Sequence, residues 1–199
     1  MNRFSCVSAA LALASVVSLL PSAAEAQPRV PRDDRDAIEV GTVDSRGSDV
    51  DTGRAVGIIN APFDDVRRVV HDYANYEAFM PHFRTSRVLA QRGHRAMVYM
   101  EVGILRDTVT LWAQLRISSR EVEGKTIVEA RMTEGNMETF RARWELEPVA
   151  DGQRTLARFQ ILVDPDLPAV PNSLIVAENV KSARRAIIRL RRRLVAVQG

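Results

Sequence analysis

The sequence contains a series of segments in which apolar and polar residues alternate, and this pattern limits the possible folds more than any other. Five such segments follow one another between residues 96 and 163. Alternation with a period of two places one set of side chains on a packed face and the other in solvent, as in an antiparallel sheet. Glu123-Gly124 and Asp151-Gly152 separate neighbouring segments and indicate tight turns. The sequence therefore predicts a long run of antiparallel strands.

One long amphipathic helix is predicted near the C-terminal end, over about residues 172–197. Apolar residues spaced by three and four form a continuous stripe along it, which is typical of a helix with one buried face. The stripe consists of Val176, Val180, Ala183, Ile187, Leu190 and Leu194. The other faces carry the basic residues Lys181, Arg184, Arg185, Arg189, Arg191, Arg192 and Arg193. We expect the stripe to face the sheet and the arginines to stay outside.

A short apolar strand over residues 54–60 precedes the alternating series, and two short helices follow this strand. Asp64 and Asp65 favour a helix start, because acidic residues stabilise the positive end of the helix dipole. The simplest way to bury all these faces is an α+β fold in which a curved antiparallel β-sheet wraps around the long C-terminal α-helix. We expect this domain to span residues 53–199.

The first 26 residues have the pattern of a cleavable signal peptide. Arg3 precedes an apolar run from Val7 to Leu20, and Ala24-Glu25-Ala26 is a small-residue cleavage site. The run is too short to cross a bilayer core, which takes about 20 apolar residues. The sequence thus predicts an exported protein, periplasmic or secreted after cleavage near Ala26. Residues 27–52 are predicted to be a flexible tether with a candidate short strand at 38–43.

Several motifs resemble the START-like helix-grip (SRPBCC) superfamily, in particular its coenzyme Q-binding and polyketide cyclase/dehydrase branch. Residues 59–66, Ile-Asn-Ala-Pro-Phe-Asp-Asp-Val, are similar to the strand-to-helix transition of that family. Residues 72–81 resemble its D-Y-x-x-Y-x-x-F-x-P segment, and residues 140–148 resemble a later strand that ends in W-x-L-x-P. Residues 165–171 resemble its proline-rich approach to the last helix. The likeness covers about residues 53–195.

This resemblance implies a hydrophobic cavity between the sheet and the terminal helix, which would hold a lipid, a quinone, a sterol or a polyketide-like molecule. The candidate lining residues are Met80, Phe83, Met100, Met132, Phe140, Trp144 and Phe159, with Val176 and Val180 from the helix. The same large side chains would equally make an ordinary packed core. The sequence leaves both interpretations open.

The leading functional hypothesis is an exported, non-catalytic binding or transfer protein for a hydrophobic ligand. One alternative is a polyketide cyclase or dehydratase, and another is a protein-interaction module without a ligand. An enzyme needs an ionisable or hydroxyl group beside the reacting carbon. The candidate polar groups are His82, Tyr99 and Glu138. For Glu138, which shares the inward parity of its strand, the alternative is a strand end that reaches solvent.

Composition and motifs argue against several other classes of site and partner. Cys6 is the only cysteine, so a chain cleaved after Ala26 has no disulfide and no cysteine-based site. The three histidines lack the spacing of a helical zinc motif, and we expect neither a metal nor a cofactor. The net charge is +3. The arginine-rich helix is either a solvated face or a contact for anionic lipid headgroups. We expect a monomer that does not bind nucleic acid.

Overall fold

The computed structural model describes residues 37–80, 82–104 and 109–198. The predicted signal peptide and the start of the predicted tether lie outside these residues. The elements, in chain order, are β1 (Ile38–Val43), β2 (Thr52–Ile59), α1 (Phe63–His71), the 3-10 helix η1 (Tyr73–Asn75), α2 (Tyr76–Phe79), β3 (Phe83–Arg92), β4 (Arg95–Ile104), β5 (Val109–Val122), β6 (Lys125–Gly135), β7 (Thr139–Val149), β8 (Arg154–Asp164) and α3 (Asn172–Gln198). None of the described helices is long and apolar enough to span a membrane.

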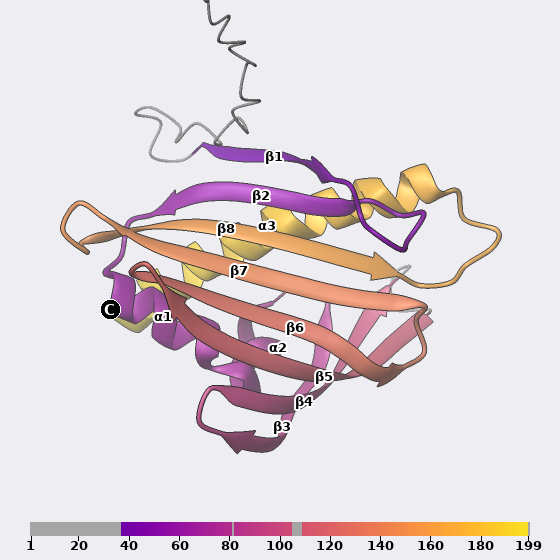
Figure 1. Cartoon of the computed structure of the whole chain (residues 1–199), viewed down its shortest axis with the longest axis horizontal. Helices are drawn as coiled ribbons and strands as arrows, with labels where there is room; N and C mark the ends of the chain where they lie inside the picture. Colours follow the sequence, from indigo (N-terminus) through magenta and orange to yellow (C-terminus); the bar gives the residue numbers. More distant parts are fainter. Residues whose placement is uncertain (1–36, 81, 105–108, 199) are drawn as a thin grey trace, which may run out of the picture. The chain divides into compact units, whose positions relative to one another are not determined.

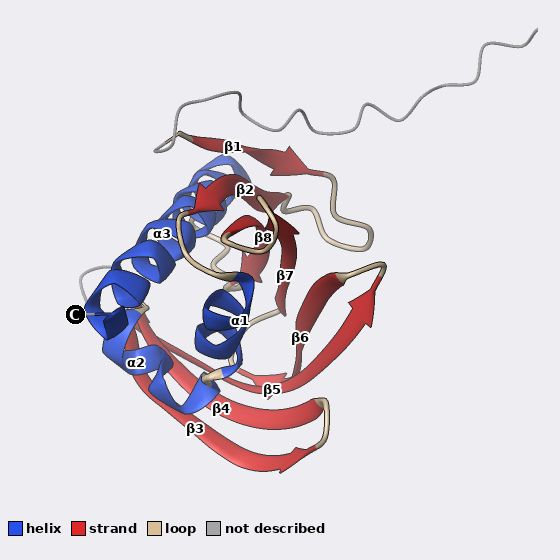
Figure 2. Cartoon of the chain, turned by 90° about the vertical axis from the view of Figure 1, so that its left-hand side faces the viewer, coloured by secondary structure: helices blue, strands red, loops and turns tan. Residues whose placement is uncertain are grey.

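The eight strands form one antiparallel sheet in the order β1-β2-β8-β7-β6-β5-β4-β3. From β3 to β8 each strand pairs with the next along the chain, and β2 closes the series by pairing with β8. Glu123 and Gly124 both have positive φ, as a two-residue hairpin turn of this type requires, and the four-residue connection between β7 and β8 has positive φ at Ala150, Asp151 and Gly152. The sheet curves around α3 and α1, as Figure 2 shows. The predicted helix-grip fold is confirmed.

Strand β1 coincides with the candidate short strand at residues 38–43, but this strand and the connection after it are packed rather than part of a flexible tether. β1 pairs with β2 over its whole length, from Ile38 opposite Gly57 to Val43 opposite Thr52 (Figure 1). Val50, in the connection, is 1% exposed and packs in a second small apolar cluster with residues of β8 and α3. Residues 38–52 are therefore part of the folded domain. A polar composition does not exclude this, because strand pairing uses backbone groups that every residue carries.

Small residues on β2 let helix α3 approach the sheet closely. A Cβ atom on Gly53 would lie only 2.2 Å from the backbone carbonyl carbon of Asn179 in α3. A Cβ atom on Gly57 would lie 3.4 Å from Cγ2 of Ile187, which is itself fully buried. α3 packs mainly on β2 and β8 and runs behind these strands in Figure 1. The helix thus covers one side of the concave face of the sheet.

The side chain of Asn179 joins α3 to the edge of β8. β8 pairs with β2 only up to Ile161, which leaves the backbone of Val163 without a strand partner on that side. Asn179 is 3% exposed, its Oδ1 accepts a hydrogen bond from the Val163 N–H at 3.2 Å, and its Nδ2 donates to the Val163 carbonyl at 3.2 Å. The amide therefore satisfies both backbone groups and fixes the position of the helix along the strand.

The outer face of the sheet carries alternating charges on neighbouring strands. Glu129 on β6 pairs with Arg120 on β5 at 2.9 Å and with Arg143 on β7 at 2.6 Å. Arg158 on β8 pairs with Glu145 on β7 at 3.1 Å. Hydrogen bonds from Arg120 lower the pKa of the Glu129 carboxyl, and the nearby cationic charges act in the same direction. These contacts connect four strands on the face away from the core.

Candidate ligand-binding cavity

A cavity of about 630 Å³ lies between the concave face of the sheet, the short helices and α3. Its walls come from β3 to β8, because the apolar residues at alternate positions of these strands point to the same side. Trp144 and Phe159 lie on adjacent strands with ring centroids 4.2 Å apart and form part of the wall. The volume is in the range of pockets that enclose a small organic molecule.

Small residues on the central strands leave this space open. Ala130 on β6 lies directly opposite Ala142 on β7, and both line the cavity. Gly103 on β4 lines it as well. A protein interior is normally filled at close to crystal density, so short side chains beside a curved sheet leave a void unless something else fills it. The cavity therefore follows from the pairing of short side chains across strands.

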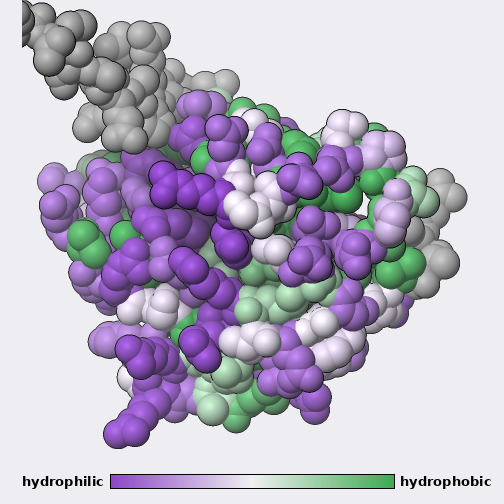
Figure 3. Space-filling model, turned by 45° about the vertical axis from the view of Figure 1, so that its right-hand side comes forward, coloured by the Kyte–Doolittle hydropathy of each residue, from purple (hydrophilic) through white to green (hydrophobic). Residues whose placement is uncertain are grey.

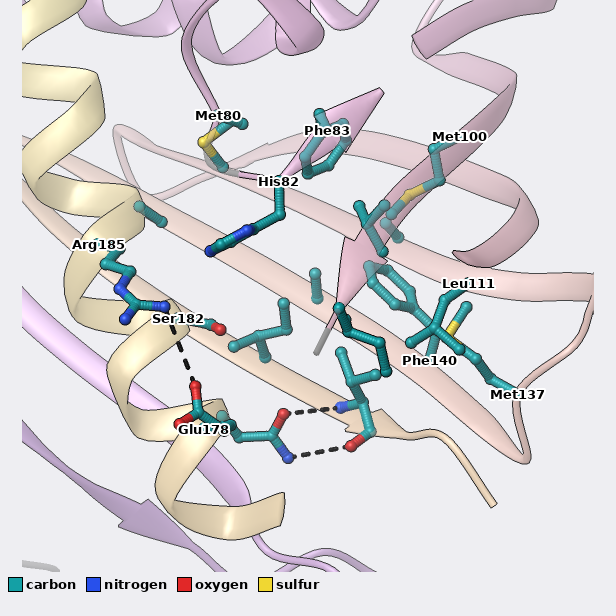
Figure 4. Close-up of a pocket in the computed structure, with 18 of the residues that line it drawn as sticks. Met80, His82, Phe83, Met100, Leu111, Met137, Phe140, Glu178, Ser182 and Arg185 are labelled. Atoms are coloured by element: carbon teal, nitrogen blue, oxygen red, sulfur yellow. Dashed lines mark hydrogen bonds and ion pairs between the residues drawn. The ribbon is translucent and has the colours of Figure 1, made fainter. Parts of the chain in front are cut away.

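Most of the predicted aromatic and methionine residues line the cavity. The lining includes Met80, His82, Phe83, Met100, Phe140, Trp144 and Phe159. Figure 4 shows Met80, His82 and Phe83 on one side, with Met100, Leu111, Met137 and Phe140 on the other. Period-two alternation placed most of the strand residues correctly, because parity along a strand determines which face a side chain joins.

Three predicted apolar lining residues lie elsewhere. Met132 is partly buried against the core but is not among the lining residues, and its sulfur lies close to the backbone of Gly135. Val176 packs against the second apolar cluster around Val50. The backbone of Val180 lies against Gly53 of β2. Both valines belong to the flank of α3 that meets β1, β2 and their connection, so the prediction had the wrong flank facing the cavity.

Two of the predicted polar groups also lie outside the cavity. The Tyr99 hydroxyl donates a hydrogen bond to Glu101 at 2.5 Å, and Arg87 lies 5.2 Å from the centre of the Tyr99 ring. Both contacts are on the opposite face of β4 from Met100. Glu138 is exposed in the turn between β6 and β7, where its backbone N–H donates to Asp164. The strand-end interpretation of Glu138 therefore holds.

The flank of α3 that meets the cavity is polar, which the sequence did not indicate. Glu178, Ser182 and Arg185 lie on successive turns of the helix, and all three are among the lining residues. Lys181 Nζ lies 2.6 Å from Glu178, and Arg185 Nη1 lies 3.9 Å from the same carboxylate. His82 has positive φ and approaches this group from the start of β3 (Figure 4). Arg185 thus lines the cavity, contrary to the expectation that all arginines stay outside.

Two tyrosines from the short helices complete the wall beside α2. The Tyr76 hydroxyl donates a 2.7 Å hydrogen bond to the carbonyl of Val70. Burial raises the pKa of Tyr73 to about 12 and also raises the pKa of Tyr76. Ser86 donates its hydroxyl to the Tyr73 carbonyl at 2.6 Å. These polar groups are therefore neutral, and two of the three hydroxyls are engaged with backbone carbonyls.

Apolar residues are exposed near the start of α3, where the cavity wall reaches the surface. Leu167, Val170 and Leu174 line the cavity from the β8–α3 connection and the first turn of the helix. The Leu174 side chain is 58% exposed. Figure 3 shows hydrophobic residues in green among hydrophilic residues in purple on this side of the molecule.

An open curved sheet, a long C-terminal helix laid across it and an apolar cavity between them define a START-like helix-grip protein. The family model described as polyketide cyclase/dehydrase and lipid transport matches residues 59–185. This match covers more than half of the chain, so the chain belongs to that family. No curated protein matches the chain in sequence.

Solved structures agree with this assignment of the fold. A STAR-related lipid transfer protein from Xanthomonas axonopodis is 18% identical, with a TM-score of 0.69, over 81% of this chain and 95% of that one. Human StAR-related lipid transfer protein 5 is 10% identical, with a TM-score of 0.71, over 82% of this chain and 85% of that one. A START superfamily protein from Mycobacterium smegmatis is 15% identical, with a TM-score of 0.62, over 73% and 98% of the two chains.

Proposed function

We propose that this protein binds one hydrophobic small molecule or lipid in its cavity and carries it without changing it chemically. The observation that carries the proposal is the cavity of about 630 Å³ with apolar walls from six strands. Removal of apolar ligand surface from water is worth about 25 cal/mol per Å², so such walls favour an apolar ligand over a polar one. The names of the Xanthomonas and human relatives, which include lipid transfer, are consistent with this proposal.

Binding is favoured over cyclase chemistry by where the predicted acid and base candidates lie, since the charged lining residues Glu178 and Arg185 are confined to the α3 flank of the cavity. Of the three candidate acids or bases, Tyr99 and Glu138 lie outside the cavity, and His82 is exposed at its edge. Tyr76 and Ser86 already donate their hydroxyls to backbone carbonyls. Proton transfer needs a group within hydrogen-bond reach of the reacting carbon or oxygen. The apolar walls instead offer surface contact along the body of a ligand.

The two tryptophans allow a direct binding test. Trp144 lines the cavity, whereas Trp112 contacts Tyr99 on the opposite face of the sheet and is not among the lining residues. In the full chain carrying Trp112→Phe, Trp144 is the only indole. After organic extraction of any bound lipid, titration with hexadecan-1-ol should change Trp144 fluorescence and saturate at one ligand per chain. A fluorescence signal that never saturates, or does not change, would argue against the proposal.

We also propose that the outer face of α3 docks on anionic membranes, where ligand would be exchanged. Arg184 and Arg192 are exposed on this helix, and Leu174 is exposed on its first turn beside the cavity. Each basic residue near an anionic surface contributes about 1 kcal/mol. Arg184→Glu should reduce sedimentation with phosphatidylserine vesicles, and salt should have the same effect by screening. Equal sedimentation of wild type and variant would remove this role.

Export is the third part of the proposal. The basic, apolar and small-residue segments of residues 1–26 form the pattern of a cleavable signal, and we propose a periplasmic or secreted location. Sequencing of the N-terminus of protein recovered from the cell envelope should give Gln27 as the first residue. An uncleaved N-terminus in a cytoplasmic fraction would contradict export.

A further inference from the structure

The charged residues of the cavity lie together at one end. Figure 4 shows Glu178, Ser182 and Arg185 along one flank of α3, with His82 turned toward them. Met100, Leu111 and Phe140 lie on the far side of the same space. The cavity therefore has a polar end on α3 and an apolar remainder against the sheet.

The polar end has an excess of positive charge. Lys181 holds the Glu178 carboxylate at 2.6 Å, whereas Arg185 is 3.9 Å from it, beyond hydrogen-bond distance. Two cations thus face one carboxylate, with the Ser182 hydroxyl as an added donor. Arg185 is about half exposed, so its charge is reached from the cavity and from water alike. A guanidinium presents a planar fork of donors that matches a carboxylate or a phosphate.

The volume limits the size of the ligand. A carbon group takes roughly the space of one water molecule in the liquid, ~30 Å³. A cavity of about 630 Å³ therefore has room for about 20 such groups. One acyl chain or one fused ring system fits this number, and a lipid with two long acyl chains does not.

We infer that the cavity selects an amphiphile with a single chain or ring system and an anionic head, carboxylate or phosphate, which contacts Arg185 and Ser182 beside His82. The apolar body then lies along Met100, Leu111 and Phe140. This inference rests on the proposed binding function and adds to it the chemical class of the ligand. The head keeps contact with water at the cavity edge, which avoids the large cost of burying a charge.

Three probes with alkyl chains of nearly the same length and different head groups separate the contribution of the head group to affinity from that of the apolar body. Hexadecanoate carries a carboxylate, hexadecyl phosphate carries a phosphate, and hexadecan-1-ol carries no charge. The experiment uses the full chain with Trp112→Phe, so that Trp144 reports binding. A charge-assisted hydrogen bond should make the better anionic probe bind about tenfold to a hundredfold more tightly than the alcohol. Which anion binds better identifies the head as carboxylate or phosphate.

Two substitutions in α3 test whether Arg185 causes the preference for the anionic probes over the alcohol. Arg185→Gln should bring the ratio of anion to alcohol affinity close to one, while the affinity for the alcohol is unchanged. Arg189→Gln is the control, because Arg189 is exposed one turn further along and does not line the cavity. It should keep the wild-type ratio.

The outcomes separate this inference from the proposed function. If the alcohol binds as tightly as both anions, or if Arg185→Gln keeps the preference, the inference about the head group is wrong while binding itself stands. If none of the three probes binds, the proposed function fails as well. Circular dichroism of both variants checks that they fold as the wild type does.

Discussion

The open space beside Ala142 gives a prediction that separates a true cavity from a loosely packed core. Ala142 lies on the central strand β7, lines the cavity and faces Ala130 across the strand pair. Ala142→Phe adds six carbon atoms, which take ~20–30 Å³ each at the packing of an interior or a liquid. The ring would thus fill about a fifth of the 630 Å³.

The expected effect on stability is small or favourable. Filling a cavity recovers about 24 cal/mol per Å³, so ~120 Å³ corresponds to at most about 3 kcal/mol before the cost of ordering the ring. Ala113→Phe is the matched control, because Ala113 is fully buried on β5 and does not line the cavity. Overpacking at that position should cost about 1–3 kcal/mol. Urea unfolding of both variants measures the difference.

The expected effect on binding is a large loss for long ligands. The ring occupies the space of about four methylene groups, and each is worth about 0.8 kcal/mol when buried, so affinity for a ligand that fills the cavity should fall about two hundredfold. A ligand about four carbons shorter should bind Ala142→Phe and wild type alike. Trp144 fluorescence in the Trp112→Phe background measures both affinities. If Ala142→Phe is destabilised as much as Ala113→Phe, or if it binds long ligands as tightly as the wild type, there is no open cavity beside Ala142.

Three further predictions concern the domain around the cavity. Gly53→Ala should lower the free energy of unfolding in urea by about 1–3 kcal/mol, because the new Cβ would overlap the backbone of α3. Gly41→Ala is the control and should cost almost nothing, since a Cβ there meets no atom within 4 Å. Equal effects of the two variants would contradict the close approach of α3. Asn179→Ala should cost about 1–3 kcal/mol by leaving two backbone groups of β8 unsatisfied, and a loss below about 0.5 kcal/mol would show that water replaces the amide. The pKa of Glu129 is lowered in the folded state, so its stabilisation is present above its ordinary pKa of 4.5 and is lost as the pH falls through the folded value. Glu129→Gln should flatten the acid-side decrease in the free energy of unfolding, and identical slopes for variant and wild type would count against the ion pairs.

The strand pattern predicted most of the fold because parity along a strand is a local property. Phe140, Trp144 and Leu146 alternate in the sequence, and all three are buried on one face of β7. The bounds of strand β1 match the candidate strand at residues 38–43, but its place in the sheet was harder to predict. Its residues bury little of their surface, and its place in the sheet depends on backbone pairing with β2 rather than on an apolar pattern.

The cavity could be predicted in part only, since it depends on contacts between distant segments. The apolar stripe of α3 indicated a buried helix, but the flank that meets the cavity depends on where β2 holds the helix. Gly53 and Gly57 set that position, and no pattern within α3 contains this information. The void itself depends on Ala130 meeting Ala142 in the register of β6 and β7. The polar end at Arg185 was missed for the same reason.

If the cavity holds one hydrophobic molecule per chain, mass spectrometry of the intact protein should detect that molecule bound. The full chain is purified without detergent from cells that supply their own lipids, measured under native conditions and measured again after organic extraction. We expect one non-covalent added mass per chain, the size of a molecule of about 20 carbon groups. This mass should disappear on extraction and should be absent or smaller in Ala142→Phe. A chain that carries no added mass, and takes up none from a total lipid extract, would contradict this expectation.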